Sequence, residues 1–214
     1  MALKVGIARF LGTNCDADIK SWMSNLSHKP SYLWFEDQFS YEDYDLVIIP
    51  GGFSHGDYLR CGALAAKTPV MKSVREFAEK GKPVLGICNG FQILCEAGLL
   101  PGALLRNESL KFKDQWVDLK VNQAATVFSN GVQTNQVIRL PIAHGEGKYY
   151  ADGETLKSLK DGEQIWLTYE DNPNGSALDI AGITNKSKNV CGLMPHPERA
   201  LAGWMGLTDG MYFL

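Results

Sequence analysis

The stretch from Pro83 to Gly98 constrains the fold of this chain more than any other. It opens with an apolar run, Val84 to Ile87, that is short enough to be a buried strand of a parallel sheet. The chain then breaks at Cys88-Asn89-Gly90 and continues with good helix formers as far as Gly98, the kind of residue that ends helices. A reactive side chain between a strand and the following helix is typical of a nucleophile elbow, which predicts an α/β sheet carrying a thiol at its carboxyl edge.

Cys88 is the candidate nucleophile of this turn. The positive end of the helix dipole favours the thiolate, which is the nucleophilic form of cysteine. Gly86 and Gly90 flank Cys88 at two residues on either side and leave room for a tight backbone. The alternative is a buried core thiol, since free cysteine is among the most buried residue types.

Composition bounds the class of protein. A length of 214 residues suits one domain, which we place at 1–214, and 45% apolar with 21% charged residues is ordinary for a globular chain. The net charge of −3 gives no sign of a basic surface that would bind nucleic acid or an acidic membrane. No apolar run approaches the ~18 residues of a membrane span. The five cysteines are scattered without a Cys-x-x-Cys pair, so we expect reduced thiols, no metal site and a cytoplasmic location.

The first half of the chain alternates between strand-like and helix-like patterns. An apolar stripe through Ile19, Trp22, Met23 and Leu26 has helical spacing, and a second helix is expected over roughly 63 to 80. The expected strands are 3–10, 32–35, 46–49 and 84–87. This alternation predicts a mostly parallel sheet with helices on both faces, in which ligands bind outside the carboxyl ends of the strands.

The second half is richer in strands. The expected strands are 116–121, 137–142, 164–169, 177–183 and 190–194, with few helical patterns between them. Some of them are therefore expected to be antiparallel, as an extension of the parallel core within the same domain.

Gly51 and Gly52 directly follow the third expected strand, and so lie at the same sheet edge as Cys88. Paired glycines let a ligand approach the main chain closely, although a plain structural turn is the alternative. Backbone N–H groups of Gly52 and Asn89 could together form an oxyanion hole for a tetrahedral intermediate.

His196 and Glu198 supply the remaining parts of a catalytic triad. His196 precedes a proline, which favours an extended backbone, and residues two apart in an extended chain point the same way. A carboxylate beside the imidazole holds its tautomer while the other ring nitrogen accepts the thiol proton. His144 lies in a glycine-flanked loop that could face substrate or partner, or be a plain turn.

These elements together resemble a class I (triad-type) glutamine amidotransferase, with a flavodoxin-like fold. Within that class, the segments from Phe53 to Ala63, Gly86 to Gln92, His144 to Gly147 and Met194 to Arg199 are similar to the family of glutaminase subunits of phosphoribosylformylglycinamidine synthase. The resemblance spans essentially the whole chain. His55 departs from it, because an aromatic residue is expected at that position.

The resemblance implies the site. Cys88 would be the nucleophile, His196 the general base and acid, and Glu198 its partner. The oxyanion hole and substrate-binding set would be Gly51, Gly52, Phe53, Asn89 and Gln92. The substrate would be glutamine, hydrolysed to glutamate and ammonia through a cysteine thioester.

The resemblance also implies partners, as part of de novo purine biosynthesis. Ammonia would pass to a synthetase subunit that converts formylglycinamide ribonucleotide to its amidine, and a small third subunit often bridges the two. No cofactor is expected in this chain, because ATP and Mg would bind the synthetase. Arg60, Arg106 and the His144 loop are candidates for the docking face, and activity of the chain alone is expected to be low.

Three alternatives stay open at this point. Another class I glutaminase would share the chemistry and differ in the acceptor, and the segment from Gly56 to Gly62 argues against it. A cysteine peptidase or deglycase-like protein often carries its histidine close behind the cysteine, whereas Asn89 stands there. A non-catalytic regulatory relative would usually have lost one of the three triad residues.

Overall fold

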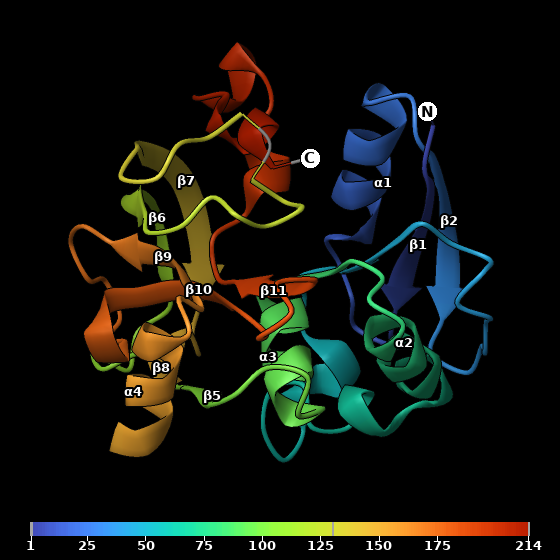
Figure 1. Cartoon of the computed structure of the whole chain (residues 1–214), viewed down its shortest axis with the longest axis horizontal. Helices are drawn as coiled ribbons and strands as arrows, with labels where there is room; N and C mark the ends of the chain where they lie inside the picture. Colours follow the sequence, from blue (N-terminus) through green and yellow to red (C-terminus); the bar gives the residue numbers. More distant parts are fainter. Residues whose placement is uncertain (1, 130, 214) are drawn as a thin grey trace.

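The computed structural model describes residues 2–129 and 131–213 and shows a nine-stranded sheet flanked by helices (Figure 1). The strands of this sheet are β1 (Lys4–Arg9), β2 (Lys29–Trp34), β3 (Leu46–Ile49), β4 (Val84–Ile87), β6 (Lys113–Val121), β7 (Val137–His144), β9 (Ile165–Tyr169), β10 (Ile180–Thr184) and β11 (Val190–Leu193). A separate two-stranded sheet pairs β5 (Ala103–Leu105) with β8 (Lys148–Tyr150). The α-helices are α1 (Asp16–Asn25), α2 (Pro69–Glu79), α3 (Asn89–Glu96) and α4 (Gly153–Asp161).

The nine strands run in the order β2-β1-β3-β4-β11-β10-β9-β6-β7. The first five are parallel to one another, and every pairing from β11 onward is antiparallel. β3 and β4 are buried along their whole length, as expected for strands covered on both faces. The prediction of a parallel core with an antiparallel extension in the second half is confirmed.

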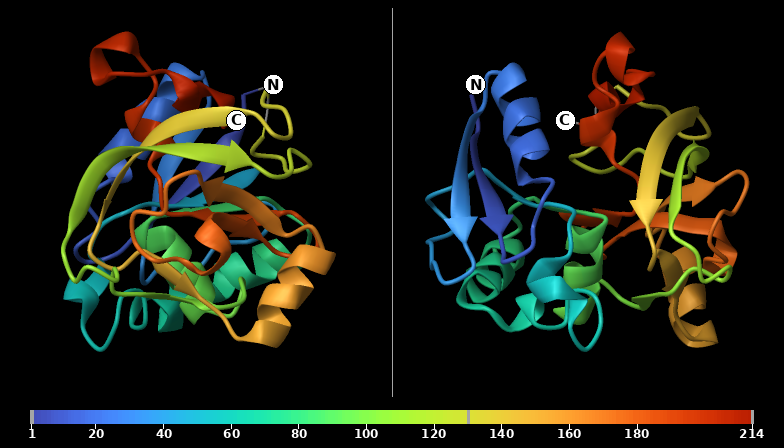
Figure 2. Two further views of the ribbon diagram at one scale, coloured as in Figure 1. Left: turned by 90° about the vertical axis from the view of Figure 1, so that its left-hand side faces the viewer. Right: turned by 180° about the vertical axis from the view of Figure 1, so that it is seen from behind.

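Helices cover the two faces of the parallel part. α1 and the C-terminal turns after His196 lie on one face, and α2 and α3 lie on the other (Figure 1). The strongly curved strands β6 and β7 lie at the opposite side of the molecule from β1 and β2 (Figure 2). In the part of the chain that the structure describes, no helix is both long and apolar enough to span a bilayer.

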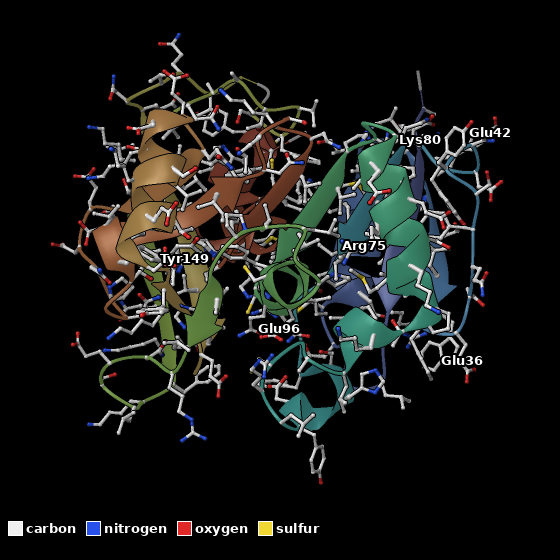
Figure 3. All side chains as sticks on the ribbon, turned by 60° about the horizontal axis from the view of Figure 1, so that its bottom comes forward. Glu36, Glu42, Arg75, Lys80, Glu96 and Tyr149 are labelled. Atoms are coloured by element: carbon white, nitrogen blue, oxygen red, sulfur yellow. The ribbon has the colours of Figure 1, made fainter. Side chains whose placement is uncertain are left out.

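Helix α3 is held between the two halves of the molecule. On one side, Arg75 of α2 donates a hydrogen bond to the carbonyl of Ala97, close to Glu96 at the end of α3 (Figure 3). On the other side, Phe91 stacks on Tyr149 with ring centroids 6.1 Å apart. Because α3 begins immediately after Cys88, this packing fixes the helix whose N-terminus faces the site.

The expected bounds of one helix and one strand were wrong. The helix expected over 63 to 80 is instead a short 3₁₀ turn and α2, because Pro69 lacks an N–H and can only begin the second helix. Leu178 and Asp179 have positive φ, so the strand expected over 177–183 begins at Ile180.

Helix α4 was not expected at all. Asp152 and Gly153 looked like a turn, but the Asp152 carboxylate accepts a hydrogen bond from the N–H of Thr155 at 2.7 Å and caps the helix. An Asp-x-x-Thr spacing followed by Leu156 and Leu159 is the signal that could have revealed it.

Candidate active site

The topology brings the expected site loops to one edge of the sheet. β3, β4 and β11 are neighbouring parallel strands, so the residues after their carboxyl ends lie together. These residues are Gly51 and Gly52 after β3, Cys88 after β4, and His196 after β11. The Cys88 N–H donates to the carbonyl of Leu193 at 2.8 Å, which ties the ends of β4 and β11 together.

Cys88 has the backbone geometry of a nucleophile elbow. Its φ is 51° and its ψ is −106°, a combination that an ordinary side chain adopts only at a cost of about 1–3 kcal/mol. The turn places the Cys88 thiol at the N-terminus of α3, with Sγ 3.8 Å from the carbonyl oxygen of Ala143. The predicted strand–turn–helix geometry around Cys88 is therefore present.

His196 and Glu198 are both almost fully buried. His196 Nδ1 lies 2.6 Å from Glu198 Oε1, so the predicted pairing is present. The extended backbone expected for this pair is not: Pro197–Arg199 form a 3₁₀ turn, and this turn brings the carboxylate to the imidazole. Burial lowers the pKa of His196, but the charges of Glu198 and Cys88 outweigh it, so its pKa is raised above its ordinary value. The imidazolium form of His196 is thus favoured at the pocket that contains Cys88.

Cys15 and Arg199 lie beside the triad. Arg199 donates a hydrogen bond from Nη2 to Cys15 Sγ at 3.1 Å. Ligand atoms of Cys15, His196 and Glu198 lie within 4.8 Å of one another, close enough to hold a metal ion. The Arg199 guanidinium, however, sets a positive charge against the Cys15 sulfur, so we assign no metal to this cluster.

A pocket of about 340 Å³ opens over the nucleophile. Of the sequence-predicted residues, Gly52, Phe53, Cys88, Gln92 and His196 line it. The His144 loop, expected to face substrate or partner or to be a plain turn, contributes Ala143, His144, Gly145 and Glu146. Residues that the sequence reading did not assign to the site complete the lining: Asn14, Cys15, Asp57, Cys61, Phe112 and Arg199. A larger cavity of about 780 Å³ lies in the antiparallel extension and contains none of the triad residues, so chemistry places the active site in the smaller one.

Gly52 and Asn89 are the predicted sources of the oxyanion-hole N–H groups. Asn89 is the first residue of α3, and its N–H and that of Gly52 have no hydrogen-bond partner within residues 2–129 and 131–213. Gly52 has a φ of 143°, and a Cβ there would lie 2.8 Å from the backbone nitrogen of Asn14. Two free N–H groups near a thiol are what an oxyanion hole needs.

Gln92 connects three segments of the site. Its Nε2 donates to the carbonyl of Glu146 at 2.6 Å, and its Oε1 accepts from Asn89 Nδ2 at 2.7 Å. Asn89 Oδ1 in turn accepts from the Ser54 N–H at 3.1 Å. Both ends of the Gln92 side chain are therefore occupied, and it holds the loops in place.

His144 is a buried anchor for the loop that follows β7. Asn107 Nδ2 donates to two carbonyls, of Lys111 and His144, so Asn107 Oδ1 is an acceptor. Oδ1 accepts from the Gly147 N–H and from His144 Nδ1, 3.0 Å away. His144 therefore carries its proton on Nδ1 and its lone pair on Nε2.

Burial, and secondarily the charge of His196, lowers the pKa of His144 to about 4. Because the unfolded chain binds a proton at this histidine near pH 6.5 and the folded chain does not, we expect stability to fall as pH drops from about 6.5 to 4. The loss amounts to about 3 kcal/mol across that window. His144→Asn should flatten this part of the pH profile in urea unfolding, and an unchanged slope would contradict the buried neutral state.

Gly51 lies directly against the triad. A Cβ at this position would lie 2.9 Å from His196 Cε1 and 3.1 Å from Cys15 Sγ. We expect Gly51→Ala to displace the imidazole and to lower kcat about 100-fold, because small misplacements of a catalytic group are costly. Glutamate release measures this effect, with Gly153→Ala as control, since a Cβ at Gly153 has no neighbour within 4 Å. Equal activity of both variants would contradict the close packing.

Two of the missed lining residues carried a signal in the sequence. Asn14 and Cys15 follow β1, which is also one of the parallel strands. The rule that ligands lie beyond the carboxyl ends of parallel strands applied to β1 as much as to β3 and β4.

Comparisons with known proteins agree with this geometry. A model of the CobB/CobQ-like glutamine amidotransferase domain matches residues 2–208. A chain in the structure of PurLQS from Thermotoga maritima is 44% identical, with a TM-score of 0.91, covering 99% of this chain and 95% of that one. A glutamine amidotransferase from Thermotoga maritima shares the fold at 19% identity, with a TM-score of 0.62, covering 94% of this chain and 78% of that one.

The chain therefore belongs to the glutamine amidotransferase family. The fold and the triad geometry place it in class I, the triad-type amidotransferases, as the sequence predicted.

Proposed function

We propose that this chain is the glutaminase subunit of phosphoribosylformylglycinamidine synthase and that Cys88, His196 and Glu198 are its catalytic residues. The observation that carries the proposal is the convergence of a strained Cys88, a buried His196–Glu198 pair and an open pocket at one sheet edge. The extensive similarity to a chain of PurLQS supports the choice of enzyme.

The geometry suits hydrolysis through a covalent intermediate. The Cys88 thiolate attacks the side-chain carbonyl carbon of glutamine, and the developing oxyanion accepts hydrogen bonds from the N–H groups of Gly52 and Asn89. His196, held by Glu198, gives a proton to the leaving ammonia and then takes one from the water that attacks the γ-glutamyl thioester. Glutamate leaves and Cys88 is regenerated.

Phe53 and Gly51 complete the substrate-binding set. Phe53 is about half exposed at the pocket, where its ring can cover the substrate. Gly51 leaves the space between His196 and Cys88 free of a side chain.

Ammonia formed in open water would be lost, so we propose that the chain acts in a complex. The relative in PurLQS occurs in an assembly whose name joins three components. A synthetase subunit that binds ATP and Mg would receive the ammonia, and a small subunit would bridge the two. Arg60 is a weaker candidate for the docking face than the sequence suggested, because it already pairs with Glu96 at 2.6 Å.

The family match favours a glutaminase over the cysteine peptidase and deglycase-like alternatives. A non-catalytic regulatory relative is disfavoured because Cys88, His196 and Glu198 are all present and the buried His196–Glu198 pair lies at the pocket that contains Cys88.

Transfer of the amide nitrogen tests the proposal. The chain, the synthetase, ATP and formylglycinamide ribonucleotide are incubated with glutamine whose amide nitrogen is isotopically labelled, in excess unlabelled ammonium. We expect glutamate release by the chain alone to be low and to rise at least about tenfold in the complex, with the label in the amidine product. Product that carries mainly unlabelled nitrogen would contradict direct transfer, and no glutamate release in any mixture would contradict the glutaminase itself.

A further inference from the structure

The pocket wall formed by Asp57, Cys61, Glu146 and His144 has no role in the chemistry described above. Asp57 and Glu146 come from two loops far apart in sequence, and both line the pocket that contains Cys88. Glutamine carries an α-ammonium and an α-carboxylate at the end remote from its reacting amide. Some part of this pocket must therefore recognise a zwitterionic amino-acid head group, if the proposed function holds.

The wall carries negative charge that nearby groups only partly compensate. Burial raises the pKa of Asp57, the Cys61 thiol lowers it, and the charge of Glu146 raises it again, so the two carboxylates repel each other. Burial raises the pKa of Cys61, followed by its hydrogen bond with Glu146 and the charge of Asp57, so this thiol stays neutral between them. Asp57 Oδ1 is buried without a hydrogen-bond partner in the described part of the chain.

The cation that pairs with Glu146 lies outside the pocket. Arg106 Nε lies 3.5 Å from Glu146 Oε1, but its side chain is 77% exposed and it does not line the pocket. Such an exposed pair contributes little and leaves Glu146 available to a second cation.

His144 adds an independent observation. It lines the same pocket, is only 3% exposed, and its Nε2 has no partner among the residues described. Because its proton is on Nδ1, Nε2 is an acceptor. The side chains of Asp57, Glu146 and His144 thus all offer acceptors, which suits an occupant rich in N–H donors and positively charged.

We propose that Asp57 and Glu146 form the subsite that binds the α-ammonium group of the amino-acid substrate. The subsite rests on the proposed function, since it selects an α-amino acid amide over amides that lack the amino group. The hydrogen bond from Gln92 to the Glu146 carbonyl holds this wall at a fixed distance from Cys88. Asp57 and Glu146 are specificity-determining residues in this account, and they do not take part in proton transfer.

Two alkylating reagents separate head-group recognition from chemistry. One is the chloromethyl ketone analogue of glutamine, and the other is the same ketone without the α-amino group. Both alkylate Cys88, and peptide mapping by mass spectrometry gives the rate of labelling. The full chain is tested alone and with the synthetase, as wild type, Asp57→Asn, Glu146→Gln and the exposed control Asp161→Asn.

We expect wild type to react much faster with the amino reagent than with the desamino reagent. Asp57→Asn and Glu146→Gln should each slow labelling by the amino reagent about 10- to 100-fold, the size of one lost charge-assisted hydrogen bond. The rate of labelling by the desamino reagent should stay within about threefold of the wild-type rate. Asp161→Asn should be labelled at the wild-type rate by both reagents. For glutamine hydrolysis, the two variants should raise KM by the same factor and leave kcat nearly unchanged.

Loss of labelling by both reagents to the same extent would overturn the proposal, because it would show that the carboxylates only maintain the fold. Equal rates with the two reagents in wild type would overturn it as well. If wild type discriminates between the reagents but releases no glutamate from glutamine in the complex, the subsite stands and the proposed function fails.

Discussion

Cys88→Ala is expected to abolish glutamine hydrolysis, with a fall in kcat of about 10⁵-fold or more. Removing a nucleophile that works through a covalent intermediate leaves only binding and the oxyanion hole, and losses of this order are typical. The variant should keep its fold, because Cys88 contributes a small side chain and the turn is held by the N–H bond to Leu193. Glutamate release in the complex with the synthetase measures the effect.

Cys95→Ala is the matched control for Cys88→Ala. Cys95 lies on α3, the helix that begins directly after Cys88, and is buried to a similar degree, but it does not line the catalytic pocket. Its variant should retain nearly full activity. If Cys88→Ala and Cys95→Ala have equal activity, Cys88 is a structural thiol and the active-site assignment fails.

Glu198→Gln should lower kcat about 10³- to 10⁴-fold while leaving KM close to that of wild type. The carboxylate lies 2.6 Å from His196 Nδ1, both side chains are buried, and the carboxylate orients the imidazole ring. The loss of a comparable orienting carboxylate has an effect of this size. Because Glu198 is the largest cause that raises the pKa of His196, its removal should lower that pKa. The pH profile of kcat/KM should therefore change shape as well as height.

The control for Glu198 is Glu154→Gln, at the exposed N-terminus of α4. A Glu198→Gln variant with lower activity but an unchanged pH profile would contradict an electrostatic role. A purely structural defect would instead lower the free energy of unfolding and raise KM together with the loss in kcat.

The parallel core and the triad could be predicted because short-range patterns specify them. The apolar run before Cys88 and the glycines around it specify strand, turn and helix within fifteen or so residues. His196 and Glu198 are also close in sequence, although a 3₁₀ turn and not the expected extended backbone brings their side chains together. Only the adjacency of β4 and β11, which brings the two motifs together, is a long-range property, and for that the family resemblance was needed.

The pocket wall could not be predicted in the same way. Asp57 and Cys61 lie in the loop after β3 and Glu146 in the loop after β7, and no spacing in the sequence records that these two loops meet at the pocket. The sequence predicts His144 in a glycine-flanked loop that faces substrate or partner or is a plain turn. His144 is instead the buried last residue of β7, held by Asn107, 37 residues earlier. The single-domain assignment to 1–214 and the absence of a cofactor stay predictions.

The most direct test of the central claim is to look for the covalent intermediate. The Glu198→Gln variant, in which hydrolysis should be slow, is mixed with glutamine in the complex, quenched in acid and mapped by mass spectrometry. We predict a γ-glutamyl adduct, equal to glutamine minus ammonia, on the peptide that contains Cys88 and on no other cysteine peptide. Steady release of glutamate with no adduct on Cys88 at any quench time, or an adduct on another cysteine, would contradict Cys88 as the nucleophile.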